Sequence, residues 1–301
     1  MTGDAGITEG TIEANGLRFG YLSAGGSGPL ALCLHGFPDS AWTWRHLLPQ
    51  LADAGYRAVA PFLRGYAPTE VPADGVYQSA MLGIDASALH DALGGDGDAV
   101  LVGHDWGALA AYCAVHDLPA EGGSRWRRLV TLAVPPPGAV AAGFLSYDQL
   151  QKSWYMFFFQ HPLADVAVGM NDLAFVDRLW ADWSPGYAAA DDLATTKAAL
   201  RDPVNLAAAI GYYRATLGNV GLSTDPAVTA LQNASGGAVP LPTLYLHGKT
   251  DGCMGAELAQ AATPFLTAEG SRLELVDDAG HFLHLERPDA VNELILKFLH
   301  E

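Results

Sequence analysis

The chain has 301 residues, of which 50% are hydrophobic and 16% charged, enough for one large domain or for a core with an insertion. Its 33 acidic and 16 basic residues give a formal net charge of −17. This balance argues against nucleic acid as a partner, because phosphate binding needs a surface rich in Lys and Arg.

The N-terminal stretch "MTGDAGITEGTIEANG" has neither a basic nor an apolar segment, so it does not resemble a signal peptide. No apolar run in the chain reaches the roughly 18 residues that a membrane helix needs. We therefore expect no membrane contact and a cytoplasmic location. The oligomeric state cannot be read from the sequence, and a homodimer stays open.

Strands and helices alternate through the first 137 residues. Asn15-Gly16 separates two alternating runs within residues 11–24, which indicates a hairpin. Continuous apolar runs predict buried parallel strands, and segments with helical spacing lie between them. We expect strands within 29–36, 56–69, 99–107 and 125–137, and helices within 41–55, 77–95 and 108–115. The alternation is typical of an α/β fold with an open, mostly parallel sheet covered by helices on both faces.

Residues 138–238 break this alternation, because they are rich in aromatic residues and hold no convincing strand pattern. Strands return within 242–251 and 272–281, and the last helix carries one apolar face. We predict a core domain of residues 1–137 and 239–301 with an inserted helical cap (lid) of residues 138–238. That last apolar face comprises Val291, Leu294, Ile295, Phe298 and Leu299.

Residues 101–110, "LVGHDWGALA", match a nucleophile elbow in all but one residue. The usual Gly-x-Ser-x-Gly turn places a Ser between a strand and a helix. Here the turn is Gly103-His104-Asp105-Trp106-Gly107, with a carboxylate at the apex. We therefore predict Asp105 as a nucleophile.

Two further residues complete a catalytic set in the order nucleophile, acid, histidine. Asp251 and His281 each follow an expected strand, so with Asp105 they should meet beyond the carboxyl ends of the sheet. Asp277 and Asp278 are rival acids, but they lie immediately before His281 and rank below Asp251.

The early loop "HGFP", residues 35–38, supplies a candidate oxyanion hole. In this architecture the hole combines the N–H after the nucleophile with one from the early loop, here those of Trp106 and Phe37. We expect His35, His104 and Pro38 to support the site without touching the reacting atoms.

The motifs "HGFP", "GHDWG", the Asp251 loop and "AGHFLHLERPD" together resemble the epoxide hydrolase branch of the α/β-hydrolase superfamily. The resemblance covers nearly the whole chain. It implies a cis Phe37-Pro38 bond and two cap tyrosines, Tyr155 and Tyr213, that donate protons to the opening ring; Tyr212 is the alternative for the second position. The family's "DxRGYGxS" loop is altered to "PFLRGYAPT" at residues 61–69, which puts the shape of one pocket wall in doubt.

An Asp nucleophile is suited to attack on a saturated carbon atom of the substrate. A Ser would leave an ether that water cannot readily open, whereas a carboxylate leaves an ester, which a His-activated water and an oxyanion hole can cleave. We predict that a small hydrophobic epoxide and water are converted to a vicinal diol. Phe37, Trp106, Trp154 and Tyr212 are the predicted substrate-binding residues.

Two alternatives stay open at this point. A haloalkane or haloacid dehalogenase would use the same nucleophile, although Phe37 and Trp106 stand where those families usually carry Asn and Arg. A non-catalytic ligand-binding homologue would be expected to have lost part of the triad.

We expect neither a metal nor a cofactor. His281 and His284 could pass for a metal-binding pair, but the sequence shows no third ligand at a sensible spacing. Three widely spaced cysteines make a disulfide framework improbable. Cys33 and Cys113 fit the core, and Cys253 falls in a loop where its thiol could be exposed.

Overall fold

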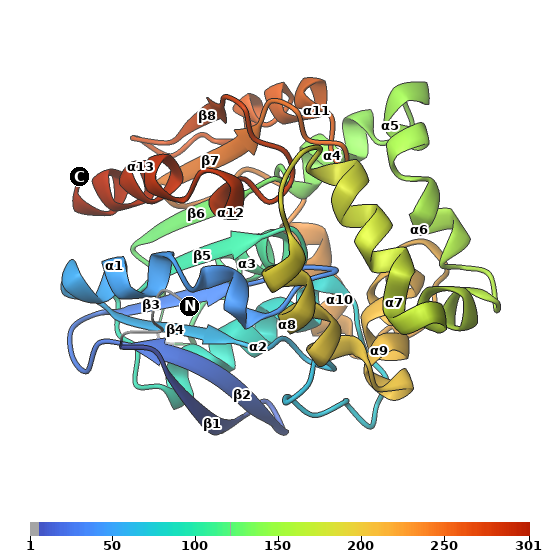
Figure 1. Ribbon diagram of the computed structural model, residues 1–301. Coiled ribbons are helices and arrows are strands. Elements are labelled where there is room, and N and C mark those ends of the chain that lie inside the picture. Colours follow the sequence, from blue (N-terminus) through green and yellow to red (C-terminus); the bar gives the residue numbers. More distant parts are fainter. Residues whose placement is uncertain (1–5, 121) are drawn as a thin grey trace.

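One sheet of eight strands, in the order β1-β2-β4-β3-β5-β6-β7-β8, runs through the computed structural model, which describes residues 6–120 and 122–301 (Figure 1). Only the β1–β2 and β2–β4 pairs are antiparallel, and the other five pairs are parallel. The predicted open, mostly parallel sheet is therefore confirmed. The strands are β1 (Thr8–Ala14), β2 (Leu17–Ala24), β3 (Leu30–Leu34), β4 (Arg57–Pro61), β5 (Val100–His104), β6 (Arg128–Leu132), β7 (Thr243–Gly248) and β8 (Arg272–Val276).

The first two strands form the predicted hairpin. Asn15 and Gly16 connect them with φ values of 45° and 73°, and Ala14 pairs with Leu17. A two-residue loop with positive φ at both positions matches the right-handed twist of the flanking strands. Asn and Gly tolerate this backbone region better than other residues, which explains why the dipeptide marks the turn.

The central strands are buried along their whole length, as a parallel sheet between two helical layers requires. Helices α1 and α13 contact each other, and α2 and α3 contact each other, so the sheet is covered from both sides (Figure 1). Two short 3-10 helices lie at Ala41–Trp44 and Thr263–Phe265. The helices of this part of the chain are α1 (Leu47–Asp53), α2 (Ser79–Ala92), α3 (Trp106–Ala114), α11 (Ala256–Gln260), α12 (Leu283–Glu286) and α13 (Pro288–His300).

Between β6 and β7 the chain forms helices α4 to α10. Helices α5 to α9 gather beside one end of the sheet (Figure 1), and Trp180 of α7 donates to the carbonyl of Pro38 at 2.7 Å, next to the end of β3. Helix α10 instead packs on α2 and α3. Their bounds are α4 (Pro137–Gly143), α5 (Tyr147–Lys152), α6 (Trp154–Phe158), α7 (Ala164–Trp183, broken at residues 170–173), α8 (Ala190–Leu200), α9 (Pro203–Leu217) and α10 (Pro226–Ala234).

In the described part of the chain, no helix has both the length and the apolar character needed to cross a bilayer.

Candidate active site

The turn between β5 and α3 puts Asp105 in a backbone conformation that side-chain-bearing residues rarely adopt. Its φ is 53° and its ψ is −117°. A Cβ atom at Gly103 would collide with the carbonyl of Gly107, and one at Gly107 would collide with the carbonyl of Leu34. The two glycines therefore allow the sharp turn, which stores local strain of the kind often found at functional sites.

The carboxylate of Asp105 is held between a main-chain donor and a histidine. Its Oδ1 accepts a hydrogen bond from the main-chain nitrogen of Phe37 at 2.7 Å, and its Oδ2 lies 3.5 Å from Nε2 of His281. Burial acts to raise its pKa, but the His281 contact and charge, His104 and the Phe37 N–H outweigh this and lower the pKa. Asp105 is thus ionised at neutral pH. The Phe37-Pro38 bond is cis, as the resemblance implied.

His281 bridges two carboxylates. Its Nδ1 lies 2.9 Å from Oδ2 of Asp251, while the other oxygen of Asp251 accepts hydrogen bonds from the main-chain nitrogens of Cys253 and Met254 at 2.6 and 2.9 Å. Burial acts to lower the pKa of His281, but the charge of Asp251 and the contacts with both carboxylates raise it to about 10. The arrangement fixes the ring and favours its protonated form while Asp105 is charged.

Two phenols face one another above this site. Tyr155 of α6 and Tyr213 of α9 are both buried, and their rings meet edge to face with centroids 5.5 Å apart. Tyr155 Oη lies 3.4 Å from the sulfur of Cys253, while Tyr213 Oη has no hydrogen-bond partner among the described residues. Burial, as the largest cause, raises the pKa of both phenols well above 10, so both are protonated at neutral pH.

A cavity of about 520 Å³ joins these groups. Asp105, Trp106, Tyr155 and Tyr213 all line it. Much of the remaining wall is apolar and comes from α4, α6, α9 and the segments beside them. Such a cavity can enclose a drug-sized apolar molecule and place it against the carboxylate and the phenols.

Several residues expected at the substrate lie elsewhere. Trp154 is 48% exposed and does not line the cavity, since one step along α6 turns its side chain about 100° away from that of Tyr155. Tyr212 points to the core, where its hydroxyl donates to the carbonyl of Arg64 at 2.7 Å. The ring of Phe37 packs on Tyr213 and on Phe159, and is also absent from the cavity wall.

Two other expectations need correction. Cys253 is buried, with 1% of its surface exposed, and its sulfur reaches the cavity beside Tyr155. The altered loop of residues 61–69 does not line the cavity. Arg64 of this loop is instead buried in a two-bond ion pair with Asp85, at 2.5 and 2.6 Å.

The supporting residues brace the loops around Asp105. Nε2 of His35 accepts from the main-chain nitrogen of Leu63 at 3.0 Å, so its Nδ1 donates to the carbonyl of Gly36 at 2.9 Å. His104 bonds through Nε2 to the carbonyl of His281 at 2.9 Å. Burial lowers the pKa of His35 to about 4 and that of His104 to about 3, so both rings are neutral at neutral pH.

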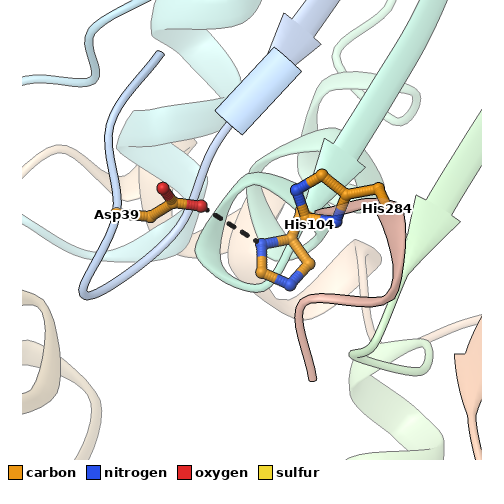
Figure 2. A group of neighbouring side chains, drawn as sticks. All are labelled: Asp39, His104 and His284. Carbon is orange, nitrogen blue, oxygen red and sulfur yellow. Dashed lines mark ion pairs between the residues drawn. The ribbon is translucent and has the colours of Figure 1, made fainter. Parts of the chain in front are cut away.

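Sequence reasoning missed a second histidine and carboxylate group beneath the triad. Asp39, His104 and His284 converge in the core, where one possible ligand atom of each lies within 4.8 Å of the others (Figure 2). Oδ2 of Asp39 and Nδ1 of both histidines have no hydrogen-bond partner among the described residues, and Oδ2 of Asp39 lies 3.8 Å from Nδ1 of His104. Two neutral imidazoles and a carboxyl group could hold a divalent ion or a buried water. His284 therefore belongs to this group, and His281 to the triad.

The comparisons with known proteins agree with this architecture. A family model described as alpha/beta hydrolase fold matches residues 29–288. Epoxide hydrolase 4 of Homo sapiens is 32% identical over 300 residues, which cover 96% of this chain and 78% of that protein. An epoxide hydrolase of Caballeronia sordidicola is 31% identical over 342 residues, which cover 99% of this chain and 96% of that protein. The structure of epoxide hydrolase A from Mycobacterium thermoresistibile matches with a TM-score of 0.79 and 27% identity, and covers 98% of both chains. The predicted fold is thereby confirmed.

Proposed function

The chain belongs to the epoxide hydrolase branch of the α/β-hydrolase superfamily, and from this premise we propose that it converts epoxides to vicinal diols through a covalent ester on Asp105. One observation carries the proposal. The carboxylate of Asp105 and the hydroxyl-bearing rings of Tyr155 and Tyr213 line the same cavity. A nucleophile and protonated phenols around one apolar space are what opening of an oxirane requires.

In the first step an oxygen of Asp105 forms a bond to one carbon of the oxirane. The C–O bond of the ring breaks, and its electron pair moves to the ring oxygen. Tyr155 or Tyr213 donates a proton to that oxygen and later regains one from solvent. Their raised pKa values support this role, because they keep both hydroxyls protonated until the ring opens.

In the second step water cleaves the ester. Nε2 of His281 takes a proton from water, whose oxygen attacks Cγ of Asp105, and the bond from Cγ to the ester oxygen then breaks. Asp251 supports this step by holding Nδ1 of His281 and stabilising its positive charge. The diol leaves with the proton from His281, and one oxygen of the regenerated carboxylate comes from solvent.

The main-chain N–H groups of Phe37 and Trp106 are the proposed oxyanion hole of this second step. The N–H of Phe37 already binds Oδ1 of Asp105 at 2.7 Å, so it lies beside the carbon that becomes tetrahedral. An oxyanion hole donor is typically worth about 10²–10³-fold in rate.

The cavity wall bears on the dehalogenase alternatives. A haloacid would bring a carboxylate, but Asp105 is the one charged side chain among the described residues that line the cavity. A halide ion leaves without needing a proton, so a halide substrate gives Tyr155 and Tyr213 no role. The complete Asp105, His281 and Asp251 set likewise supports catalysis over ligand binding alone.

We keep the domain bounds as part of the proposal, with a core of residues 1–137 and 239–301 and a cap of residues 138–238. The helices α4 to α9 and the position of Tyr155 and Tyr213 above Asp105 support a cap that supplies the ring-opening acids.

Single-turnover hydrolysis of a styrene-oxide-type substrate in ¹⁸O-water tests the proposal. We expect the label in Asp105 and not in the first diol released. In a His281→Gln variant, which lacks the base for the second step, we expect mass spectrometry to find the substrate bound to Asp105. Labelled diol in the first turnover, together with no adduct in the variant, would refute the ester mechanism.

A further inference from the structure

The cavity above Asp105 has a polar end as well as an apolar wall. Gln78 and Ser79, at the start of α2, line it together with Gln232 of α10. Helix α2 packs on the sheet and α10 packs on α2 and α3, whereas the apolar wall comes largely from α4, α6 and α9. The cavity is therefore polar at one place that the proposed reaction does not use.

Gln78 has a hydrogen-bond donor with nothing to bind. Its side-chain oxygen accepts from the main-chain nitrogen of Ser223 at 2.6 Å, which identifies the other amide atom as nitrogen. Within residues 6–120 and 122–301, no atom accepts a hydrogen bond from that nitrogen. Gln78 is only 7% exposed, and what it faces is the cavity. The nitrogen is reached from the cavity, where water or an acceptor on a bound molecule can accept its hydrogen bond. A bound molecule that displaces the water without offering an acceptor loses this hydrogen bond, so a molecule that carries an acceptor is favoured at this position.

The neighbouring residues hold this end of the cavity in place. The side-chain oxygen of Gln232 accepts from the main-chain nitrogen of Ala80 at 2.9 Å, and its nitrogen lies 2.8 Å from the hydroxyl of Ser79. Ser79 and Gln232 thus satisfy each other and join α2 to α10. The amide nitrogen of Gln78 is therefore the donor that remains free at this end of the cavity. The hydrogen bonds between α2 and α10 hold this end in place without a ligand.

Charge limits what this donor can bind. Asp105 is the single charged side chain in the described cavity wall, and no Lys, Arg or His stands beside Gln78 in that wall. A carboxylate brought into the cavity would lose its hydration and meet no cation, and it would also share the cavity with ionised Asp105. The acceptor must therefore be neutral, such as the oxygen of an ester, amide, ether or alcohol.

We propose that Gln78 forms a subsite for a neutral hydrogen-bond acceptor, so that the preferred substrates are largely apolar epoxides with such an oxygen away from the oxirane. This inference rests on the proposed function for the reaction and on the Gln78 contacts for the substrate class. The cavity of about 520 Å³ has room for a molecule with both groups.

The test compares three epoxides of equal chain length, which end in a methyl ester, in a hydrocarbon or in a free carboxylic acid. Gln78→Met keeps the length of the side chain and removes the donor. Gln78→Glu keeps the oxygen that Ser223 needs and also removes the donor. Gln260→Met, at an exposed position of α11, is the matched control.

We expect the ratio of kcat/KM for the ester to that for the hydrocarbon to fall about 2- to 12-fold in both Gln78 variants, the range of one net hydrogen bond. The Gln260→Met protein should keep the wild-type ratio, and the free acid should be a poorer substrate than the ester. An unchanged ratio in both Gln78 variants, or a free acid that matches the ester, would overturn the inference.

Cyclopropane analogues of the three compounds separate this inference from the proposed function, because they can bind but cannot be opened. Their dissociation constants should show the same dependence on Gln78. If this dependence is found while no epoxide is turned over, the subsite stands and the proposed reaction fails. If the epoxides are turned over and the dependence is absent, the reaction stands and the subsite fails.

Discussion

The main-chain nitrogen of His281 donates a hydrogen bond to the carbonyl of Trp183 at 3.1 Å. The same carbonyl accepts from Gly252 at 3.0 Å, so the end of α7 holds the His281 loop and the Asp251 loop together. Ser184 adds a further link, because its hydroxyl donates to Glu286 at 2.6 Å and accepts from the main-chain nitrogen of Phe282 at 3.1 Å. The helical insertion thus positions the triad as well as covering it.

Replacing Ser184 with Ala should lower both stability and turnover. The change leaves the N–H of Phe282 without its acceptor, which costs about 1–3 kcal/mol of unfolding free energy. Phe282 directly follows His281, so the loss of its hydrogen bond should also disturb the position of His281 and lower kcat. Urea unfolding and steady-state kinetics measure the two effects.

Ser271→Ala is the control, since that hydroxyl accepts from Thr243 at 3.0 Å at the far end of the sheet. It should lower stability while kcat stays as in the wild type. Equal kcat values in the two variants would contradict a positioning role for Ser184.

Breaking the ion pair between Arg64 and Asp85 should cost far more stability than breaking an exposed ion pair. Both side chains are buried, at 2% and 4% exposure, and two hydrogen bonds join them. Asp85→Ala leaves the Arg64 guanidinium buried without its carboxylate, so we expect a loss of about 3–5 kcal/mol in urea unfolding. Asp182→Ala breaks the exposed pair with Arg178 and should cost less than about 1 kcal/mol. Similar losses in the two variants would refute this assignment.

The elements and the meeting of Asp105, Asp251 and His281 could be predicted because their signals are local. A strand followed by Gly103-His104-Asp105-Trp106-Gly107 identifies the elbow, and Asp251 and His281 each follow a strand of the same parallel sheet. Parallel strands bring their carboxyl ends to one edge, so chain order alone predicts that the three side chains meet.

The choice between neighbouring residues could not be made in this way. Tyr212 and Tyr213 are adjacent on α9, and a rotation of about 100° per residue decides which one faces the cavity. That rotation is set by packing on Tyr66, Tyr77 and Trp106, none of which is close in sequence. The same ambiguity led us to expect Trp154 at the substrate.

Contacts between distant segments also could not be predicted from the sequence. Ser79 and Gln232 are 153 residues apart, and Asp39 meets His104 and His284 only in the folded core. The position of Cys253 in a loop left open that its thiol is exposed, but α5 and α6 cover it. Such positions become apparent only when both partners are in place.

The two chemical steps should depend differently on pH. In the free protein the charges of Asp251 and Asp105 raise the pKa of His281 to about 10, against the opposing effect of burial. Formation of the ester neutralises Asp105, so the pKa of His281 falls. Because the second step needs neutral His281, its rate should rise with pH through this lowered pKa.

The first step should be nearly flat between about pH 6 and 9, because that range crosses neither the lowered pKa of Asp105 nor the raised pKa values of the tyrosines. Rapid-quench measurement of ester formation and ester decay gives the two profiles separately. Asp251→Asn should shift the decay profile to lower pH, since it removes the strongest influence that raises the pKa of His281. A decay rate that falls as pH rises would rule out His281 as the base.

Tyr213→Phe should slow catalysis without destabilising the protein. Its buried hydroxyl makes no well-formed hydrogen bond among the described residues, although Trp106 and Tyr155 lie close enough to lower its pKa against the effect of burial, so its removal should cost little stability. As a ring-opening acid it should nevertheless matter, with a loss of about 10²–10⁴-fold in the rate of ester formation when both Tyr213 and Tyr155 are replaced by Phe.

Tyr212→Phe should show the reverse, because its hydroxyl bonds to Arg64 and does not reach the cavity. We expect it to lose about 0.5–1.5 kcal/mol of stability with a far smaller effect on rate. If the Tyr212 variant loses more activity than the Tyr213 variant, then Tyr213 is not the second ring-opening acid.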